Sequence, residues 1–272
     1  MKSTELFDVK GLATVVTGAA SGIGLAYSEV MAANGARVTL MDVDEAKLAV
    51  RVACLTDTGA DVRGVAVDVT NRKAMRQAFD TTADSYGRLD VVFANAGIDA
   101  GPGFLTPDGD RDPDGALENI QDAHWDRVIA TNLTSVFTTL QCAVRHMRKA
   151  RSGHIIVTTS NAALINEPIV GTPYMAAKAA AAHLVRQAAL ELARFNICVN
   201  AIAPGAFVTN IANGRLQNAA DRKAFEDRSP MHRIAETSDI KGLALYMASA
   251  ASSYMTGAQV VIDGGHRLGA VD

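Results

Sequence analysis

The chain has little cysteine, and the cysteines it has are scattered. Its 272 residues include three, Cys54, Cys142 and Cys198, which are too few and too far apart for a disulfide framework or a CxxC metal site. We expect each to be a small core residue in a reducing compartment. None of the six histidines stands at a metal-ligand spacing from another, so we expect no metal site and assign the histidines to the surface or to packing.

The sequence also lacks a long apolar run and a cluster of one charge. No apolar segment approaches the length of a membrane-spanning helix, and the first eight residues do not resemble a signal peptide. The formal net charge is −3, and Lys and Arg form no dense run. Neither nucleic acid nor a membrane surface is therefore expected as a partner, and the default expectation is a soluble cytoplasmic protein.

Apolar residues make up 49% of the chain, in segments that alternate between strand-like and helix-like patterns. Strands are predicted at residues 12–17, 37–41, 62–67, 89–94, 155–159, 197–202 and 259–262. Helices are predicted at residues 22–34, from 44 onward, and at 72–85, 125–149, 174–194 and 238–247. Continuous Val/Ile/Leu strands separated by helices indicate a parallel sheet covered on both faces. We predict a doubly wound, Rossmann-like α/β fold in a single domain spanning residues 1–272.

Two segments depart from this alternation. Residues 99–122 are rich in Gly, Pro and Asp and are predicted to form a long loop, which in compact domains is usually functional or disordered. Because ligands of open α/β sheets bind beyond the carboxyl ends of the strands, this loop is expected to form a pocket wall or a subunit contact. A solvated surface excursion is the alternative. Residues 210–233 are polar with a helical composition.

A glycine-rich turn, Thr17-Gly-Ala-Ala-Ser-Gly-Ile-Gly24, follows the first predicted strand. Gly18 permits the sharp turn, Gly22 lets backbone amides approach a pyrophosphate, and Gly24 allows close packing of helix and strand. The helix amino terminus would then face the phosphates. A purely structural β–α connection is the alternative, and the absence of GK[ST] argues against a P-loop. The expected dinucleotide contacts in this turn are Gly18, Ser21, Gly22, Ile23 and Gly24.

An acidic residue, Asp42, ends the second predicted strand about 20 residues beyond the glycines. A carboxylate there can accept hydrogen bonds from both ribose hydroxyls of an adenosine, and it would repel a 2′-phosphate. Neither Ala20, Ser21 nor Val43 supplies a compensating cation, and Arg37 begins the strand at its far end. NAD is therefore the expected cofactor, rather than NADP.

Tyr174 and Lys178 stand one helical turn apart, on one face of a long Ala-rich helix. A phenoxide and an ammonium group about 5 Å apart attract each other by roughly 3 kcal/mol at an effective dielectric constant of about 20. We therefore expect Lys178 to lower the pKa of Tyr174, so that the phenol can exchange protons near neutral pH.

Several motifs occur in the order found in short-chain dehydrogenases/reductases. They are the glycine turn, Asn95-Ala-Gly97, Asn132, Ser160, Tyr174-x-x-x-Lys178 and Pro204-Gly205. From about Gly11 to Gly265 the chain resembles the compact, single-domain branch of this family. The resemblance implies that residues 210–233 cover the substrate and that the protein is a homo-oligomer, a tetramer or a dimer.

The resemblance also implies further contacts with the dinucleotide. Asp68 and Val69 would receive the adenine, and Asn95 and Gly97 would support the sheet and the adenosine ribose. The nicotinamide would lie against residues 204–209, with contacts expected from Pro204, Phe207 and Thr209. Tyr174 and Lys178 are expected to contact the cofactor as well.

Four residues match the family's catalytic positions. Tyr174 would exchange a proton with the substrate oxygen, Ser160 would hydrogen-bond the same oxygen, and Lys178 would hold the nicotinamide ribose. Asn132 would position a water molecule that passes protons to solvent, although a satisfied core amide is the alternative.

The position of the catalytic serine is ambiguous. The family places it thirteen residues before the tyrosine, which here is Asn161, but the flanking residues 153–164 match when Ser160 takes that place and one residue is inserted before Tyr174. We favour Ser160.

We therefore predict an NAD-dependent oxidoreductase that interconverts a secondary alcohol or diol and a ketone, on a hydrophobic or cyclic small molecule. A catalytically inactive dinucleotide sensor or scaffold on the same fold is the alternative. A SAM-dependent methyltransferase would leave the Tyr174/Lys178 pair unexplained.

Overall fold

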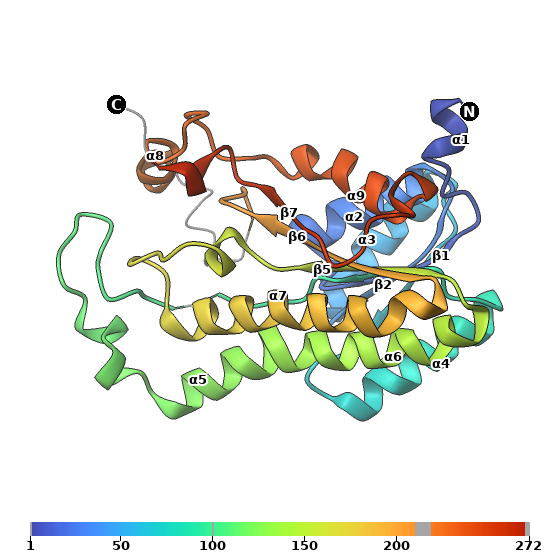
Figure 1. Cartoon of the computed structure of the whole chain (residues 1–272), viewed down its shortest axis with the longest axis horizontal. Helices are drawn as coiled ribbons and strands as arrows, with labels where there is room; N and C mark the ends of the chain where they lie inside the picture. Colours follow the sequence, from blue (N-terminus) through green and yellow to red (C-terminus); the bar gives the residue numbers. More distant parts are fainter. Residues whose placement is uncertain (1, 100, 210–218, 270–272) are drawn as a thin grey trace.

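A seven-stranded parallel sheet forms the centre of the computed structural model, which describes residues 2–99, 101–209 and 219–269 (Figure 1). The order of the strands in the sheet is β3-β2-β1-β4-β5-β6-β7, so the chain winds outward in both directions from β1 and β4. The predicted doubly wound fold is confirmed. The strands are β1 (Ala13–Thr17), β2 (Arg37–Asp42), β3 (Val62–Ala66), β4 (Val91–Ala94), β5 (Gly153–Thr158), β6 (Ile197–Pro204) and β7 (Gln259–Ile262).

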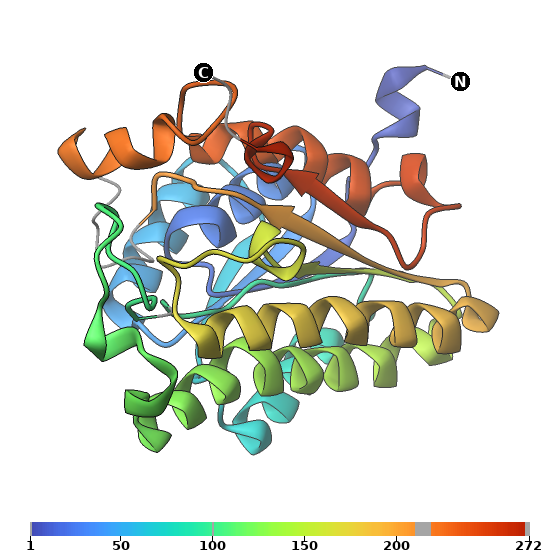
Figure 2. The ribbon, with the colours of Figure 1, turned by 60° about the vertical axis from the view of Figure 1, so that its left-hand side comes forward.

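Helices cover both faces of the sheet (Figures 1 and 2). One layer contains α4 (Arg72–Tyr86), α5 (Asp122–Ile129), α6 (Ser135–Ala150) and α7 (Thr172–Leu192). The other contains α2 (Gly22–Ala33), α3 (Glu45–Asp57) and α9 (Lys241–Ala248). Two short helices, α1 (Ser3–Leu6) and α8 (Ala219–Glu226), complete the described part of the chain.

Residues in the strands alternate between two apolar cores, one under each helical layer. In β1, Val15 packs into the core formed with α4, α6 and α7, whereas Val16 packs into the core formed with α2, α3 and α9. In β5, Ile155 and Ile156 divide in the same way. Because successive strand residues point to opposite faces and both faces are covered, the strands need unbroken apolar runs. This explains why they could be predicted from the sequence.

Two helix predictions differ from the structure. The segment predicted as one helix at residues 125–149 is divided into α5 and α6 by a π-helical turn, Ala130–Thr134, a widening that is frequent at functional sites. The helix predicted at residues 238–247 begins as a 3-10 turn, Thr237–Ile240, before α9. Apolar spacing does not distinguish these turns from a regular α-helix.

The cysteine prediction holds for one residue and fails for another. Cys142 is buried in the core and Cys198 is half-buried, but Cys54 is exposed on α3. Only Leu48 of α3 is buried, so most of this helix, Cys54 included, faces solvent.

The loop at residues 99–122 is anchored to the rest of the protein near its start, while residues 107–111 are exposed. Residue 100 lies outside the described residues. It contains two 3-10 turns, Pro113–Gly115 and Leu117–Asn119. The backbone amide of Leu105 donates to the carbonyl of Pro168 over 3.0 Å, and Pro102 bridges to Val170. The loop is therefore held by main-chain contacts to the segment that precedes α7.

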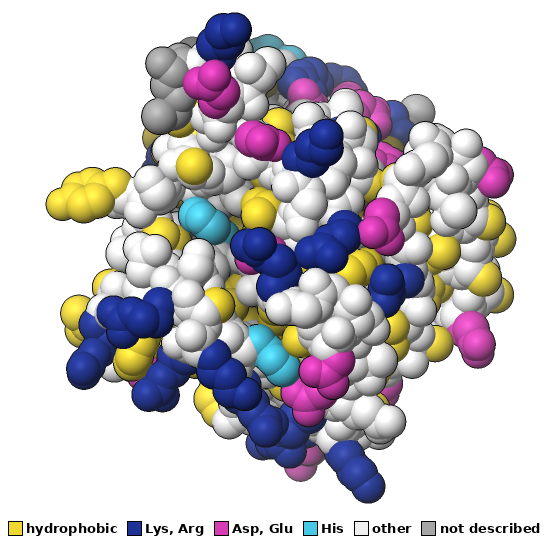
Figure 3. All heavy atoms as spheres, turned by 90° about the vertical axis from the view of Figure 1, so that its right-hand side faces the viewer, with side chains coloured by type: hydrophobic (Ala, Val, Ile, Leu, Met, Phe, Trp, Pro, Cys, Tyr) yellow, Lys and Arg dark blue, Asp and Glu magenta, His cyan; other side chains and the backbone are white. Residues whose placement is uncertain are grey.

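Two features of the structure correspond to the hydropathy and the charge of the sequence. No helix in the described ranges has the length and apolar character needed to cross a membrane. On the end of the molecule opposite the carboxyl ends of the strands, basic and acidic side chains are both present among other residues (Figure 3).

Part of the segment expected to cover a substrate, residues 210–233, lies outside the described residues. Those are residues 210–218, which include Asn210, Ile211 and Leu216. The described part consists of α8 and the residues that follow it, among which the amide of Met231 donates to the carbonyl of Gly264.

Gly24 is the point of closest approach between α2 and the turn after β1. A Cβ atom added there would lie 2.1 Å from the carbonyl oxygen of Gly18 and 2.5 Å from Nδ2 of Asn95. The backbone therefore requires a glycine here, as the sequence motif predicts.

We expect Gly24→Ala to lower the free energy of unfolding by about 3 kcal/mol, because the added methyl group forces backbone atoms apart. Chemical denaturation measures this change. Gly242→Ala is the matched control. Gly242 is also helical, and a Cβ atom added there has no other atom within 4 Å. This variant should be slightly more stable than the wild type, because alanine favours the helix more than glycine does. Equal stability of the two variants would contradict the packing described here.

Candidate active site

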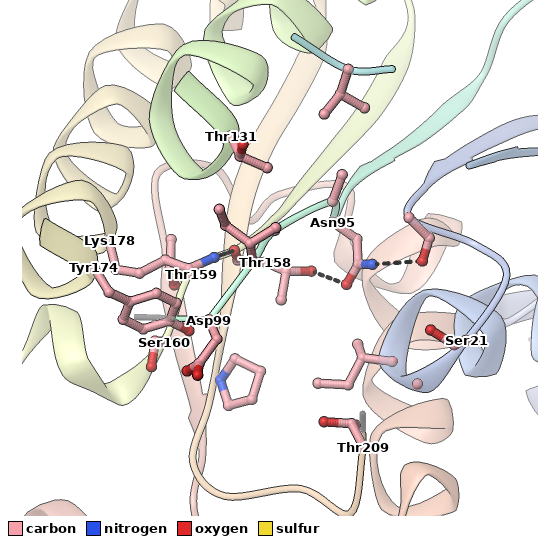
Figure 4. A pocket seen from close by; sticks show the side chains of 18 of the residues that line it. Ser21, Asn95, Asp99, Thr131, Thr158, Thr159, Ser160, Tyr174, Lys178 and Thr209 are labelled. Carbon is pink, nitrogen blue, oxygen red and sulfur yellow. Dashed lines mark hydrogen bonds between the residues drawn. The ribbon is translucent and has the colours of Figure 1, made fainter. Parts of the chain in front are cut away.

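A cavity of about 860 Å³ opens at the carboxyl ends of the strands. Its walls come from the residues at or just beyond the ends of β1, β2, β3, β4, β5 and β6, and from the start of α7 (Figure 4). The predicted site residues that line it are Gly18, Ser21, Gly22, Ile23, Asp42, Asp68, Val69, Asn95, Gly97, Ser160, Tyr174, Lys178, Pro204, Phe207 and Thr209. Two predicted residues, Gly24 and Asn132, are not in this lining.

The glycine turn presents backbone to the cavity. Gly18 and Gly22 have φ angles of 65° and 56°, a left-handed conformation that glycine adopts without strain. A Cβ atom on Gly22 would lie 3.2 Å from Cγ2 of Thr209, and α2 begins here with its amino terminus at the cavity. A helix amino terminus lined by glycines fits a pyrophosphate.

Asp42 is fixed beside this turn. Its Oδ2 accepts the amide of Ala20 at 2.9 Å and its Oδ1 accepts the amide of Asp44 at 3.0 Å. An ionised carboxylate has about four acceptor positions, so these two bonds orient the group and leave capacity for the two hydroxyls of a ribose. Nearby, Lys47 is paired with Asp44 at 2.6 Å.

Asn95 joins the glycine turn to β5. Its Nδ2 donates to the carbonyls of Thr17 and Gly18 at 3.1 and 3.3 Å, and its Oδ1 accepts the hydroxyl of Thr158 at 3.0 Å (Figure 4). Every polar atom of this amide therefore holds a cavity wall in place. Asp68 is fixed in a similar way, because it accepts both the amide and the hydroxyl of Thr70 at 2.8 Å.

Asn132 is fully buried in the π-helical turn between α5 and α6. Its Oδ1 accepts the amide of Ile98 at 3.1 Å, and its Nδ2 donates to the carbonyl of Ile98 at 3.2 Å. The amide thus fixes the segment after β4, which lines the cavity at Gly97 and Ile98. These contacts are those of a satisfied core amide, the alternative that the sequence left open.

Tyr174 and Lys178 project into the cavity from the first turns of α7 (Figure 4). The Nζ of Lys178 donates to the carbonyl of Thr158 at 2.8 Å and lies 5.4 Å from the centre of the Tyr174 ring. Ser160 lies beside the tyrosine in the same cavity (Figure 4). The end of β5 thus brings Thr158 and Ser160 to the two residues that α7 supplies.

The expected effect of Lys178 on the pKa of Tyr174 is wrong for the protein alone. Burial raises the pKa of Tyr174 to about 12, hydrogen bonding with Ser160 acts in the opposite direction, and the charge of Asp99 raises it further. Burial also lowers the pKa of Lys178 to about 8. Lys178 is almost excluded from water and Tyr174 is half-buried, so for both groups the cost of carrying a charge outweighs the attraction assumed from sequence spacing.

Asn161 points away from the cavity. Its Oδ1 accepts the hydroxyl of Ser160 at 3.3 Å, and its Nδ2 lies 3.5 Å from Nδ1 of His266. Ser160 lines the cavity and Asn161 does not. Of the two residues, the geometry therefore places Ser160 where a substrate oxygen could reach it.

Several lining residues were not expected from the sequence. Thr158 lies next to the end of the strand predicted at residues 155–159, and Asp99 begins the predicted loop, so their positions offered a signal. His124, Arg127 and Thr131 come from α5 and the turn after it, where nothing in the apolar spacing marks one face as a cavity wall. No group of three or more His, Cys, Asp or Glu suited to a metal ion was found among the described residues.

Comparison with known proteins gives matches along most of the chain. A family model described as Enoyl-(Acyl carrier protein) reductase matches residues 18–267. The chain is 34% identical to sorbose reductase of Schizosaccharomyces pombe, over 97% of this chain and 98% of that protein. It is 36% identical to cis-4-hydroxycyclohexanecarboxylate dehydrogenase of Sinomonas cyclohexanicum, over 93% and 95%. Among solved structures, it resembles NADPH-dependent 3-quinuclidinone reductase of Rhodotorula rubra, with a TM-score of 0.85, 33% identity and coverage of 98% and 95%.

The low pKa of Lys178 predicts how stability depends on pH. Between about 8 and its ordinary value of 10.5, the unfolded state binds a proton that the folded state does not, so folding becomes more favourable as the pH rises. Relative to Lys178→Met, the wild type should gain about 3 kcal/mol of unfolding free energy across this range. Denaturant unfolding of both proteins at several pH values measures the gain. A difference independent of pH would show that Lys178 is not desolvated.

Proposed function

The chain belongs to the short-chain dehydrogenase/reductase family, and we propose that it is an NAD-dependent member in which Tyr174 is the general acid and base. It is an oxidoreductase that interconverts a secondary alcohol and a ketone. The observation that carries the residue assignment is the convergence of Tyr174, Ser160 and Lys178 on one cavity that also contains the glycine turn and Asp42.

The catalytic roles follow from what each group can donate or accept. Tyr174 holds its proton in the protein alone, which suits donation to the oxygen of a ketone. Ser160 hydrogen-bonds the same oxygen and stabilises the negative charge that develops on it. In the oxidation direction Tyr174 must accept a proton, so its pKa has to fall. A positive charge bound in the cavity would lower it.

Other residues support this pair. Lys178 would hold the ribose of the bound dinucleotide, and its ammonium is kept in place by the carbonyl of Thr158. Asn132 organises the wall at Ile98 through both polar atoms of its side-chain amide, so its role is to position this wall. When bound, the nicotinamide supplies or accepts the hydride.

Asp42 supports the preference for NAD. Its carboxylate is held at the cavity by two backbone amides, so a 2′-phosphate would meet a fixed negative charge. Lys47 is engaged by Asp44, and Arg37 donates to the carbonyls of Gly11 and Tyr86 at the other end of β2. We assign the adenine to Asp68 and Val69, which line the same cavity.

The substrate we propose is a secondary alcohol or diol on a small hydrophobic or cyclic skeleton. The cyclic skeleton is supported by the similarity to a cis-4-hydroxycyclohexanecarboxylate dehydrogenase, and the similarity to a sorbose reductase supports a secondary alcohol or diol. In this chain, Asp99 and Gly101 of the long loop form part of the cavity wall. The loop and the segment at residues 210–233 would enclose the substrate. No observation favours an inactive sensor.

We also propose a cytoplasmic homo-oligomer, a dimer or a tetramer. Its support is the exposure of large apolar side chains at several places: Trp125 on α5, Phe137 on α6, Leu190 on α7, and Tyr254 and Leu268 near the carboxyl terminus. Burial of such side chains between subunits is favourable.

We expect Tyr174→Phe to bind NADH as the wild type does and to lose turnover, because the ring remains and only the exchangeable proton is removed. Fluorescence titration with NADH and a rate assay over a panel of secondary alcohols and cyclic diols measure the two properties. Retained turnover would refute the role of Tyr174. Binding of NADH without turnover by the wild type on every compound would instead favour a sensor.

We expect kcat/KM to be at least about 10-fold higher with NAD than with NADP, since a fixed carboxylate and a phosphate repel each other. Asp42→Ala should narrow this ratio, mainly by improving the use of NADP. Steady-state kinetics with both cofactors measure the ratio. A preference of the wild type for NADP would overturn the role of Asp42.

A further inference from the structure

A buried carboxylate, Glu167, lies outside the cavity and has no part in the mechanism described above. It belongs to the segment between Ser160 and α7, and its side chain is only 8% exposed. Its Oε2 accepts Nη2 of Arg228 at 2.9 Å, and its Oε1 lies 3.1 Å from Nε2 of His266. Burial acts to raise the pKa of Glu167, but the hydrogen bond from His266 and the charge and hydrogen bond of Arg228 outweigh it and lower the pKa.

His266 connects this carboxylate to the site through Asn161. The ring is 13% exposed, and its second nitrogen, Nδ1, lies 3.5 Å from Nδ2 of Asn161. The Oδ1 of the same amide accepts the hydroxyl of Ser160 at 3.3 Å. A continuous series of polar contacts therefore runs from Arg228, after α8, through Glu167, His266 and Asn161 to Ser160.

The ionised carboxylate of Glu167 determines which group donates and which accepts at each later contact in this series. An ionised carboxylate only accepts hydrogen bonds, so Nε2 of His266 carries the proton that faces Glu167. In a neutral ring Nδ1 is then an acceptor, which requires Asn161 to turn its NH2 group toward His266. The amide oxygen consequently faces Ser160 and accepts its hydroxyl.

This arrangement uses the hydrogen-bonding capacity of Ser160 in a defined way. A serine hydroxyl has one donor and two acceptor positions. The donor is directed to Asn161, one acceptor position takes the amide of Ala162 at 3.2 Å, and the other acceptor position remains open beside Tyr174 (Figure 4). If the Asn161 amide were reversed, its NH2 group would occupy that open position, and the Ser160 proton would lose the acceptor that sets its direction.

We propose that Glu167 and His266 are positioning residues that fix the orientation of the Asn161 amide and, through it, the direction of the Ser160 hydroxyl. The proposal rests on the catalytic roles proposed for Ser160 and Tyr174. The two contacts of Asn161 are long for hydrogen bonds, so the Ser160 hydroxyl can leave the amide at little cost when a substrate oxygen arrives. Fixing a histidine tautomer with a carboxylate is an established way to orient a neighbouring group.

The first test needs no change at the site. In protein labelled with ¹⁵N at histidine, the ring nitrogens of His266 are assigned by their loss in His266→Gln. In the neutral form of the ring, the proton should be on Nε2. A neutral ring with its proton on Nδ1 would overturn the proposal. This result does not depend on activity, so it stands apart from the test of Tyr174.

The second test changes the carboxylate. In Glu167→Gln the new amide can donate to Nε2, which favours the proton on Nδ1 and reverses Asn161. We expect the ¹⁵N signal of His266 to change accordingly and kcat to fall about 10-fold, with the affinity for NADH unchanged. Glu167→Asp, which keeps a carboxylate, should retain more of the activity and the Nε2 proton.

Asp80→Asn is the matched control. Asp80 also pairs with a histidine, His146, at 2.9 Å, but on α4 and α6 away from the cavity, so kcat should not change. A fall in kcat in Glu167→Gln without a change in which ring nitrogen of His266 is protonated would show that Glu167 acts only through stability. A change in the protonated nitrogen with normal kcat would show that the tautomer of His266 does not affect catalysis. Either result contradicts the proposal. If Glu167→Gln does not fold, the measurement on the wild type decides.

Discussion

The bond between the Lys178 ammonium and the carbonyl of Thr158 is the constraint on which the site depends. It joins α7 to the end of β5 over 2.8 Å and holds a cation in a place that is almost closed to water. The hydroxyl of Thr158 is bonded in turn to Asn95, which clamps the glycine turn. The catalytic helix, the central strand and the phosphate-binding turn are therefore connected through one residue.

Burial shifts the pKa values of the tyrosine and the lysine in opposite directions. Each group is more stable without charge, so the tyrosine keeps its proton and the lysine gives its proton up more easily. Such a pair is electrostatically poised: a positive charge entering the cavity stabilises the tyrosinate without requiring the protein to rearrange. We infer that the cavity is built to respond to the charge of what it binds.

The sequence was sufficient for the parts of the molecule that depend on local pattern. Strands buried on both faces require unbroken apolar runs, and such runs mark the central strands β1, β4 and β5. The edge strand β3 contains Arg63 and Gly64 and is only partly buried, but it was also expected close to its bounds. Gly24 was expected where the backbones meet. The sequence could not reveal the π-helical turn that contains Asn132, because apolar spacing is similar in both kinds of helix. It also could not give the direction of the Tyr174 pKa, since spacing reports proximity and not desolvation. The connection of Glu167 with His266 joins residues 99 positions apart, and no local signal marks such a contact.

Burial, rather than the neighbouring lysine, controls the ionisation of Tyr174 in the protein alone. The most direct measurement is the ultraviolet absorbance of tyrosinate as a function of pH, taken as the difference between the wild type and Tyr174→Phe without dinucleotide. The account predicts that Tyr174 ionises only above the ordinary tyrosine value of about 10. Ionisation of Tyr174 well below that value, close to neutral pH, would contradict it.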